Sequence, residues 1–179
     1  MNIYYQGNPG SYMHSASIAI EPYLWEKPSE IVWKTIFKDV WEQITLGNIW
    51  VLAIENSYMW SIHPNLYGFL KHDCKIIGEY YGKVDHCLCS LEDHTSKIKI
   101  VYSQTPALEQ CYKYIQEFNI ETRECSDTAL SAKIAAQSEE PWVAGICSEL
   151  AAKIYWLNIL DTCIQDQKNN TTRFAIITL

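Results

Sequence analysis

The chain has 179 residues, of which 48% are apolar and 20% are charged, and it carries a formal net charge of −7. This length and composition suit one globular domain, or two small lobes, with a sizeable core. The acidic balance argues against a surface for nucleic acid or for an anionic membrane, although a local pocket of donors is still able to hold a small anion.

The sequence predicts a protein of the cytoplasm. No stretch reaches the about 18 uncharged apolar residues that span a bilayer, and the N-terminus lacks the pattern of a signal peptide. In the cytosol the seven cysteines are expected to be thiols. Cys87 and Cys89 lie beside His86, but no second pair of ligands accompanies them. We therefore expect Cys87 and Cys89 to be small apolar residues on one face of a strand. We expect no metal and no cofactor.

The N-terminal segment predicts a strand, a turn and a helix. Residues 2–6 form the strand, Gly7-Asn8-Pro9-Gly10 the turn, and Ser11 opens a helix over 12–20. Such a junction presents free backbone N–H groups to an anion, but it also occurs as plain connectivity. Residues 22–28 are then expected to form a loop.

A second helix is indicated by apolar residues at helical spacing, Phe37, Val40, Trp41 and Ile44. Gly47 is expected to end it. The apolar run 50–54 predicts a strand that is buried on both faces. Glu55, Asn56 and Ser57 follow at the carboxyl end of this strand, where open α/β sheets bind ligands. An equally weighted alternative is that Asn56 or Ser57 does no more than cap the next short helix.

The second half of the chain alternates strands with helices that begin at small polar residues. Strands are predicted at 75–81, 84–90, 98–102, 120–124, 142–147, 159–160 and 175–179. Helices are predicted at 66–71 and after Thr105-Pro106, Ser126-Asp127-Thr128 and Ser148. This alternation indicates an α/β fold.

A polar cluster precedes the last strand, Asn170-Thr171-Thr172-Arg173-Phe174. Polar groups at a strand edge are costly to bury unless they find partners. The cluster is therefore either a well-satisfied structural corner or a site.

These junctions resemble, in collinear order over nearly the whole chain, the catalytic domain of prephenate dehydratases. The matching segments are Gly7-Asn8-Pro9-Gly10-Ser11-Tyr12 with His14, Ile54-Glu55-Asn56-Ser57, Ile77-Gly78-Glu79, His86-x-Leu88, Val101-Tyr102-Ser103, Ala107-Leu108-x-Gln110-Cys111, Ser126-x-Thr128-Ala129, Ile164-Gln165-Asp166 and Asn170-x-Thr172-Arg173-Phe174. Thr-Arg-Phe is the hallmark of that family. The departures are Ala53 for Pro, Tyr58-Met59-Trp60 where the family has x-Glu-Gly, and Gln104-Thr105-Pro106 for His-Pro-Gln.

The resemblance implies a two-lobed α/β fold, similar to type II periplasmic binding proteins, with a cleft between the lobes. Residues 1–179 would form a single catalytic domain, with lobe 1 at about 1–78 plus 164–179 and lobe 2 at about 79–163. Thr172 would lie on the hinge side of the cleft, and the lobes would close on a ligand. We expect a homodimer, as family members usually associate, and no ACT regulatory domain for feedback by phenylalanine.

The resemblance also implies an activity, the conversion of prephenate to phenylpyruvate with loss of CO2 and water in phenylalanine biosynthesis. Thr172 is the residue expected to act on the leaving hydroxyl, and Arg173 either fixes a carboxylate or pairs with an acid such as Glu55. Phe174 walls the ring or belongs to the core. The other residues expected to bind the substrate are Asn56, Ser57, Ser126, Thr128, Glu55, Ser11 and Asn170.

Two other functions are open at this point. One is a related decarboxylase that removes CO2 without making an aromatic ring. The other is an inactive two-lobed protein that binds a small molecule, which the altered residues after Ser57 suggest.

Overall fold

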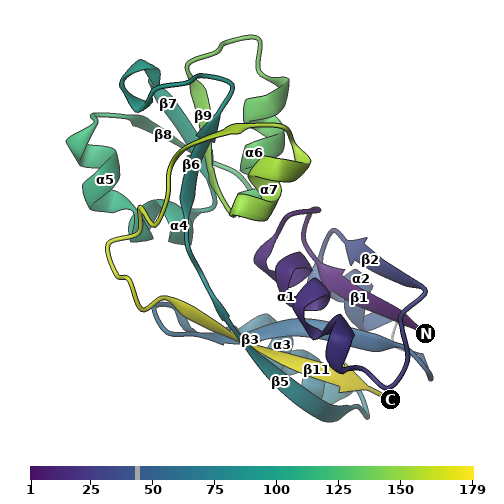
Figure 1. The fold of residues 1–179 in the computed structure, drawn as a ribbon. Helices are drawn as coiled ribbons and strands as arrows, with labels where there is room; N and C mark the ends of the chain where they lie inside the picture. The colour runs from purple at the N-terminus through teal and green to yellow at the C-terminus, as the bar shows by residue number, and fades with distance from the viewer. Residues whose placement is uncertain (43–44) are drawn as a thin grey trace. The chain divides into compact units, whose positions relative to one another are not determined.

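The computed structural model describes residues 1–42 and 45–179. Contacts divide the chain into two units, each with its own β-sheet (Figure 1). The first unit comprises Met1–Asn8, Tyr12–Val84 and Asn169–Leu179, and the second comprises Pro9–Ser11 and Asp85–Lys168. The predicted α/β class is confirmed in both units. The predicted lobe boundaries at 78/79 and 163/164 stay a prediction, because these units are defined by contacts alone.

The first unit is built on a mixed sheet. Its strands run in the order β2 (Glu30–Lys34), β1 (Asn2–Gln6), β3 (Ile49–Asn56), β11 (Thr171–Thr178) and β5 (Lys75–Lys83), and the short β4 (Trp60–Ser61) pairs with β3. β1 is parallel to β2 and β3, whereas β11 is antiparallel to β3 and β5. The C-terminal strand therefore lies between two strands from the first half of the chain.

Helices cover both faces of this sheet. One face packs against α1 (Tyr12–Ile20), which is followed by the short 3-10 helix η1 (Glu21–Tyr23), and the other against α2 (Phe37–Glu42) and α3 (His63–Lys71). Alternate residues of β3 enter the two cores, so the prediction that this strand is buried on both faces is confirmed. Ile44, predicted for the same face as Val40, lies outside the described residues.

The second unit has a five-stranded sheet with helices on both faces. The strand order is β10 (Asn158–Asp161), β6 (Cys87–Ser90), β9 (Val143–Cys147), β7 (Ile100–Ser103) and β8 (Glu121–Glu124). The helices are η2 (Thr95–Lys97), α4 (Thr105–Gln110), α5 (Tyr112–Glu117), α6 (Thr128–Gln137) and α7 (Glu149–Ile154). α6 and α7 pack on one face, and α4 and α5 on the other.

Cys87 and Cys89 lie on one face of β6 inside the core beneath α6, as the sequence predicted. Burial raises the pKa of Cys87 to about 12, so this thiol stays protonated at neutral pH. Within residues 1–42 and 45–179, no group of three or more His, Cys, Asp or Glu residues is placed to hold a metal ion. No helix of the same residues is long and apolar enough to cross a bilayer.

Several element boundaries differ from the prediction. β2 was not predicted, because its residues have no clear alternation and it is defined by parallel pairing with β1. The helix predicted after Thr105-Pro106 is capped by Gln104 rather than by Thr105. Cys111 interrupts this helix, which is therefore divided into α4 and α5. Within the predicted helix start Ser126-Asp127-Thr128, Asp127 is the residue that caps α6, and its side chain accepts a hydrogen bond from Leu130 N at 2.8 Å.

The contact between β9 and α6 depends on the absence of a side chain at Gly145. A Cβ atom there would lie 2.8 Å from the backbone C and O atoms of Ser131. We predict that Gly145→Ala lowers the free energy of unfolding by about 2 kcal/mol, because overpacking forces the helix away from the sheet. Chemical denaturation measures this change. Gly78→Ala is the matched control, since its Cβ would meet only Ile176 at 3.5 Å. Equal losses in the two variants would contradict the prediction.

Candidate functional site

The predicted C-terminal cluster lies where β11 begins and β3 ends. Thr172 pairs with Asn56, and Arg173 pairs with Glu55. Thr172 lies two residues before Phe174 on β11, so both side chains point to the same face of the sheet. Phe174 is buried in the core beneath α1. Because directly opposed residues share a face, Asn56 and Thr172 lie on the α1 face and Glu55 and Arg173 on the α3 face.

A β-bulge makes this arrangement possible. The register between β11 and β3 shifts between Arg173 and Phe174, which leaves Ile54 without a direct partner. Strict alternation from Ala53, which faces α1, would turn Asn56 to the opposite face. The extra residue reverses this and aims Asn56 at Thr172.

The side chain of Asn56 is the hub of the cluster. Its Nδ2 donates to Asn170 Oδ1 at 2.8 Å, to Thr172 Oγ1 at 2.9 Å and to Thr171 O at 3.3 Å. Its Oδ1 accepts the backbone N–H groups of Tyr58 at 2.9 Å and Met59 at 3.0 Å. These two donors fix which end of the amide is oxygen. Asn56 therefore joins the turn after β3 to the start of β11.

Thr172 is held with its hydroxyl hydrogen available. The residue is 7% exposed, and Oγ1 accepts the amide hydrogen of Asn56. An amide nitrogen only donates, so the hydroxyl must be the acceptor in this bond. Within the described part of the chain, the hydroxyl makes no other hydrogen bond. Its own hydrogen is therefore available to a ligand.

Ser57 and Asn170 strengthen the same corner. Ser57 N donates to Thr171 O at 2.9 Å, and Ser57 Oγ accepts from Thr171 N at 2.9 Å while it donates to Asn169 O at 3.1 Å. Asn170 is 2% exposed, and its carbonyl accepts from Val84 N at 2.8 Å. The polar groups that the sequence placed here are thus largely satisfied by one another.

Arg173 makes ion pairs with two protein carboxylates. Its guanidinium donates to Glu79 Oε1 and lies 3.5 Å from Glu55 Oε2. The hydrogen bond from Arg173 holds the pKa of the Glu79 carboxyl below its ordinary value. Glu55 is the partner that the sequence suggested, whereas Glu79 was not predicted, because only the pairing of β5 with β11 brings it to Arg173. The direct role of Arg173 toward substrate stays a prediction.

Phe174 belongs to the core. It is 2% exposed, and its ring centroid lies 6.2 Å from that of Tyr80. This is the second of the two roles that the sequence left open for it. Its part in substrate binding stays a prediction.

Trp60 follows the same turn in an unusual conformation. Its φ is 62°, in the left-handed region that favours glycine, and its side chain is 77% exposed. It lies opposite Asn56 in the pairing of β4 with β3. The substitution of Trp for the glycine expected from the family pattern thus falls where glycine suits the backbone.

The other predicted site residues belong to the second unit. Ser11 is 5% exposed, Thr128 is the first residue of α6 and is 3% exposed, and Ser126 is exposed. Ser148 caps α7 by accepting from Ala151 N at 3.0 Å, and its hydroxyl donates to Gly10 O at 2.5 Å. These residues and the Thr172 cluster lie in different units, so a shared substrate site stays a prediction.

The second unit contains a buried polar network that residue patterns alone did not reveal. His86 is 2% exposed, and its Nε2 lies 2.9 Å from Gln110 Oε1. Burial lowers the pKa of His86, so the ring is neutral and Nε2–H donates to the amide oxygen. Gln165 accepts from His86 N at 2.9 Å and donates to Asp85 at 2.9 Å. The network joins β6 to the segment that leads back to the first unit.

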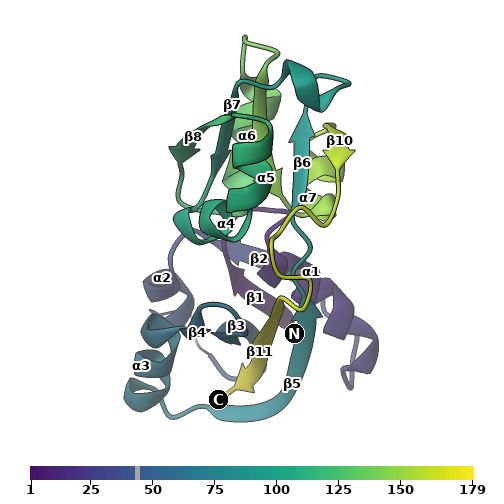
Figure 2. The same ribbon diagram turned by 90° about the vertical axis from the view of Figure 1, so that its left-hand side faces the viewer.

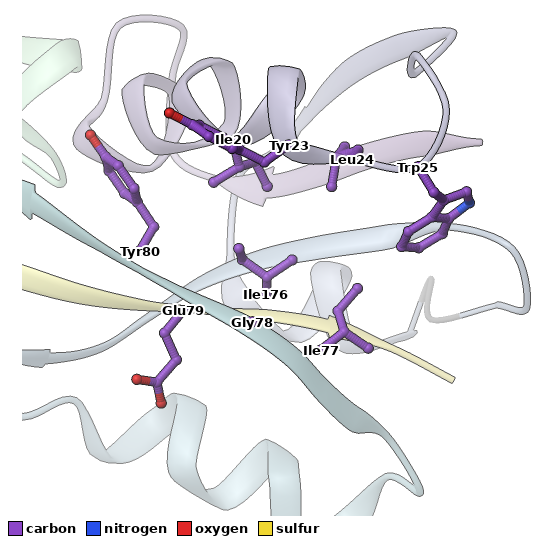
Figure 3. A pocket seen from close by; sticks show the side chains of 9 residues that line it. All are labelled: Ile20, Tyr23, Leu24, Trp25, Ile77, Gly78, Glu79, Tyr80 and Ile176. Carbon is purple, nitrogen blue, oxygen red and sulfur yellow. The ribbon is translucent and has the colours of Figure 1, made fainter.

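A cavity of about 640 Å³ lies beside β5 in the first unit. Its walls are mainly apolar, and they include Ile20, Leu24, Trp25 and Ile176 (Figure 3). Figure 3 shows Glu79 directed to the other side of β5 from Tyr80. Thr172 does not line this cavity. The mainly apolar walls of the cavity do not suit a ligand with two carboxylates.

A family model and two relatives with known names match the chain in sequence. The family model described as prephenate dehydratase matches residues 3–179. An arogenate dehydratase/prephenate dehydratase 1 of Arabidopsis thaliana is 36% identical over 178 residues, covering 99% of this chain and 45% of that protein. A prephenate dehydratase of Methanocaldococcus jannaschii is 36% identical over 140 residues, covering 78% of this chain and 51% of that protein. The chain thus spans about half the length of these relatives.

A solved structure shares the fold. The prephenate dehydratase of Staphylococcus aureus subsp. aureus Mu50 superposes with a TM-score of 0.82 at 27% identity, over 99% of this chain and 66% of that one. The expected two-lobed α/β fold is confirmed by this similarity.

The hydrogen bonds of Asn56 predict a large effect on stability. We expect Asn56→Ala to lower the free energy of unfolding by about 2–3 kcal/mol, because it leaves buried polar groups of the corner unsatisfied. Ser57→Ala, at an exposed position of the same turn, should cost only about 1 kcal/mol. Thermal or urea unfolding measures both changes. If Asn56→Ala lowers the free energy of unfolding no more than Ser57→Ala does, the central structural role of Asn56 would be contradicted.

The left-handed conformation of Trp60 predicts a stabilising substitution. Trp60→Gly should raise the free energy of unfolding by about 0.5–1 kcal/mol, because relief of backbone strain exceeds the entropy that glycine adds to the unfolded chain. Trp33 on β2 is the matched control, being 46% exposed without a positive φ. Trp33→Gly should destabilise. Urea unfolding compares the two variants, and destabilisation by both would show that Trp60 is not strained.

Proposed function

The chain belongs to the prephenate dehydratase family, and we propose that it converts prephenate to phenylpyruvate with release of CO2 and water. This is a carbon–oxygen lyase reaction, assigned here to phenylalanine biosynthesis. The observation that carries the proposal is the buried Thr172 hydroxyl, which accepts from Asn56 and gives its hydrogen to no described residue.

The reaction needs positioning and hydrogen-bond donors more than covalent chemistry. Prephenate carries a ring carboxylate, a side-chain carboxylate and a ring hydroxyl. The electrons of the bond to the ring carboxylate enter the ring as CO2 leaves, and the hydroxyl leaves as water once it gains a proton. Preorganised donors at the leaving oxygen stabilise the charge that develops there.

Thr172 is the proposed catalytic residue. A threonine hydroxyl is a poor acid near neutral pH, so it acts as a hydrogen-bond donor to the leaving hydroxyl. The hydrogen bond that Oγ1 accepts from Asn56 polarises the O–H group and strengthens it as a donor. The same bond holds the hydroxyl in one direction, because Asn56 is itself held by the turn.

In the proposal, the remaining predicted residues bind the substrate together with this donor. Asn56 and Ser57 have contacts that suit positioning, since they satisfy the corner around Thr172. Arg173, Phe174, Glu55 and Asn170 complete the proposed set in the first unit. Ser11, Ser126 and Thr128 are proposed to supply neutral donors from the second unit, which suits an acidic chain that binds a dianion.

Arogenate is a second candidate substrate because relatives are named for it. It differs from prephenate in bearing an amino group where prephenate has a keto group. The ring chemistry at Thr172 would be the same for both. A cytoplasmic location, expected from the sequence, remains part of the proposal.

One assay separates the candidate functions. The purified chain is incubated with prephenate, and in parallel with arogenate, and the products are identified by chromatography. Formation of phenylpyruvate at an enzymatic rate supports the dehydratase. A non-aromatic keto acid would indicate the decarboxylase, and unchanged substrate that nevertheless binds would indicate the inactive binding protein.

Thr172→Ala tests the proposed donor. We expect kcat to fall about 100-fold or more. The free energy of unfolding should change by only about 1 kcal/mol, because Asn56 keeps two other acceptors. Thr172→Ser should retain most of the activity. Steady-state kinetics and urea unfolding measure the two effects.

Thr178→Ala on the same strand is the matched control. Its hydroxyl donates to Asn48 O at 3.0 Å, at the end of β11 away from the cluster. Removing it should cost a similar amount of stability and leave kcat unchanged. A Thr172→Ala variant with the turnover of the wild-type chain would contradict the catalytic role of Thr172.

A further inference from the structure

The cavity beside β5 lies within the first unit, and Thr172 is not part of its walls. The end of α1 and the segment that follows it form one wall, and β5 with part of β11 forms the other. β5 is the edge strand of the sheet, and Figure 2 shows it beside β11 at the outside. The volume of about 640 Å³ is within the range of about 300–1,000 Å³ that is typical of sites for small molecules. The cavity is therefore large enough to bind one.

The floor of the cavity is open because β5 has a glycine there. Gly78 lies opposite Ile176, which belongs to the core beneath α1, so a side chain at position 78 would also point to the α1 face. A Cβ atom at Gly78 would meet only Ile176, at 3.5 Å. A glycine inside a strand weakens the strand and often marks a place where a ligand or a second backbone comes close. Apart from the chain neighbours of Gly78, no described backbone atom lies within 4 Å of this Cβ position, so the room is left for a ligand.

Three aromatic rings line the cavity, those of Tyr23, Trp25 and Tyr80. Figure 3 shows Trp25 and Tyr80 at opposite ends of it, with Ile20 and Ile176 between them. Tyr23 and Trp25 are 87% and 66% exposed. Exposed apolar side chains that gather around a concave surface are typical of binding sites. A ligand with aromatic rings would cover this surface and contact the rings of the wall face to face or edge to face.

The charged group nearest to the cavity is directed away from it. Among the described residues that line the cavity, only Glu79 is charged, and Figure 3 shows its carboxylate on the other side of β5. There the carboxylate accepts hydrogen bonds from the Arg173 guanidinium and from the Tyr81 hydroxyl, the latter at 3.2 Å. A charged ligand would lose its hydration in the cavity without gaining a partner of opposite charge. The walls therefore favour an uncharged ligand.

The core of the first unit fixes the floor of the cavity. Ile20 and Ile176 are buried in the same cluster beneath α1, and the Tyr80 ring packs against that cluster. The centroids of the Tyr80 and Phe174 rings are 6.2 Å apart. A preformed site loses little conformational entropy when it binds a ligand, so more of the contact energy appears as affinity.

We propose that this cavity is a second binding site of the first unit, for an uncharged small molecule with aromatic rings. The ligand contacts the rings of Trp25 and Tyr80. It lies on Ile20 and Ile176 and fills the room at Gly78. None of the residues assigned to the proposed activity lines the cavity, so the two sites are tested independently.

Two fluorescent probes with the same rings test this site. N-phenylnaphthylamine is uncharged, and anilinonaphthalene sulfonate carries a sulfonate on the same framework. Both become strongly fluorescent when they leave water, so titration of the 179-residue chain measures their Kd. The uncharged probe should bind saturably with one molecule per chain. The sulfonate should bind about 10-fold more weakly or worse, because the cavity offers its charge no partner.

Two substitutions in the cavity should weaken binding of the uncharged probe. Gly78→Ile fills the floor with a side chain that suits a strand, and its Cβ meets Ile176 only at 3.5 Å. Trp25→Ala removes an aromatic wall at an exposed position, where the loss of the ring leaves the fold intact. Each should raise the Kd about 10-fold or more. Trp156→Ala is the matched control, since this exposed tryptophan belongs to the second unit, and it should leave the Kd unchanged. Urea unfolding checks that each variant is folded.

Competition and sedimentation distinguish the other possible occupants. Excess prephenate should leave the uncharged probe bound, and displacement would mean that the cavity is the substrate site. If the probe separates a pair of chains in sedimentation velocity, the cavity holds a second copy instead. Either result would overturn the proposal. So would a lack of saturable binding, equal affinity for the two probes, or an unchanged Kd in either Gly78→Ile or Trp25→Ala.

Discussion

The hydrogen bonds of one amide, that of Asn56, hold the candidate site together. They connect the end of β3 to residues 114 to 116 positions later in the chain, at the start of β11. A buried amide that makes fewer bonds would cost stability, so the corner forms only when both segments are in place. The same bonds orient the Thr172 hydroxyl. The hydrogen bonds that stabilise this corner thus also place the proposed donor.

The insertion of the C-terminal strand between β3 and β5 has a second consequence. It brings Arg173 between Glu55 and Glu79 on the α3 face, so the cation that follows Thr172 in the sequence is balanced by two protein acids. At Thr172 itself, the described neighbours are the neutral side chains of Asn56 and Asn170. The acidic chain is able to carry such a site without a basic surface.

The extent to which the sequence predicted these features depends on how local each one is. The run 50–54 predicted β3 because a strand buried on both faces shows as continuous apolar residues. The small edge strand β2 has no such signature, and it is defined by its pairing with β1. In the same way, Ser126-Asp127-Thr128 predicted the start of a helix but not which residue caps it. The cap is Asp127, and only the path of the backbone selects one among adjacent capping residues.

The sequence by itself determined the α/β class, the buried central strand and the family motifs that carry Asn56 and Thr172. Only the tertiary structure decided that these two side chains meet. The physical reason is the bulge at Ile54, which turns Asn56 to the α1 face against the strict alternation of the strand. A bulge arises from the register between β3 and β11, whose residues are far apart in the chain. Residue periodicity reports the local conformation of each strand, whereas this register depends on the packing of both.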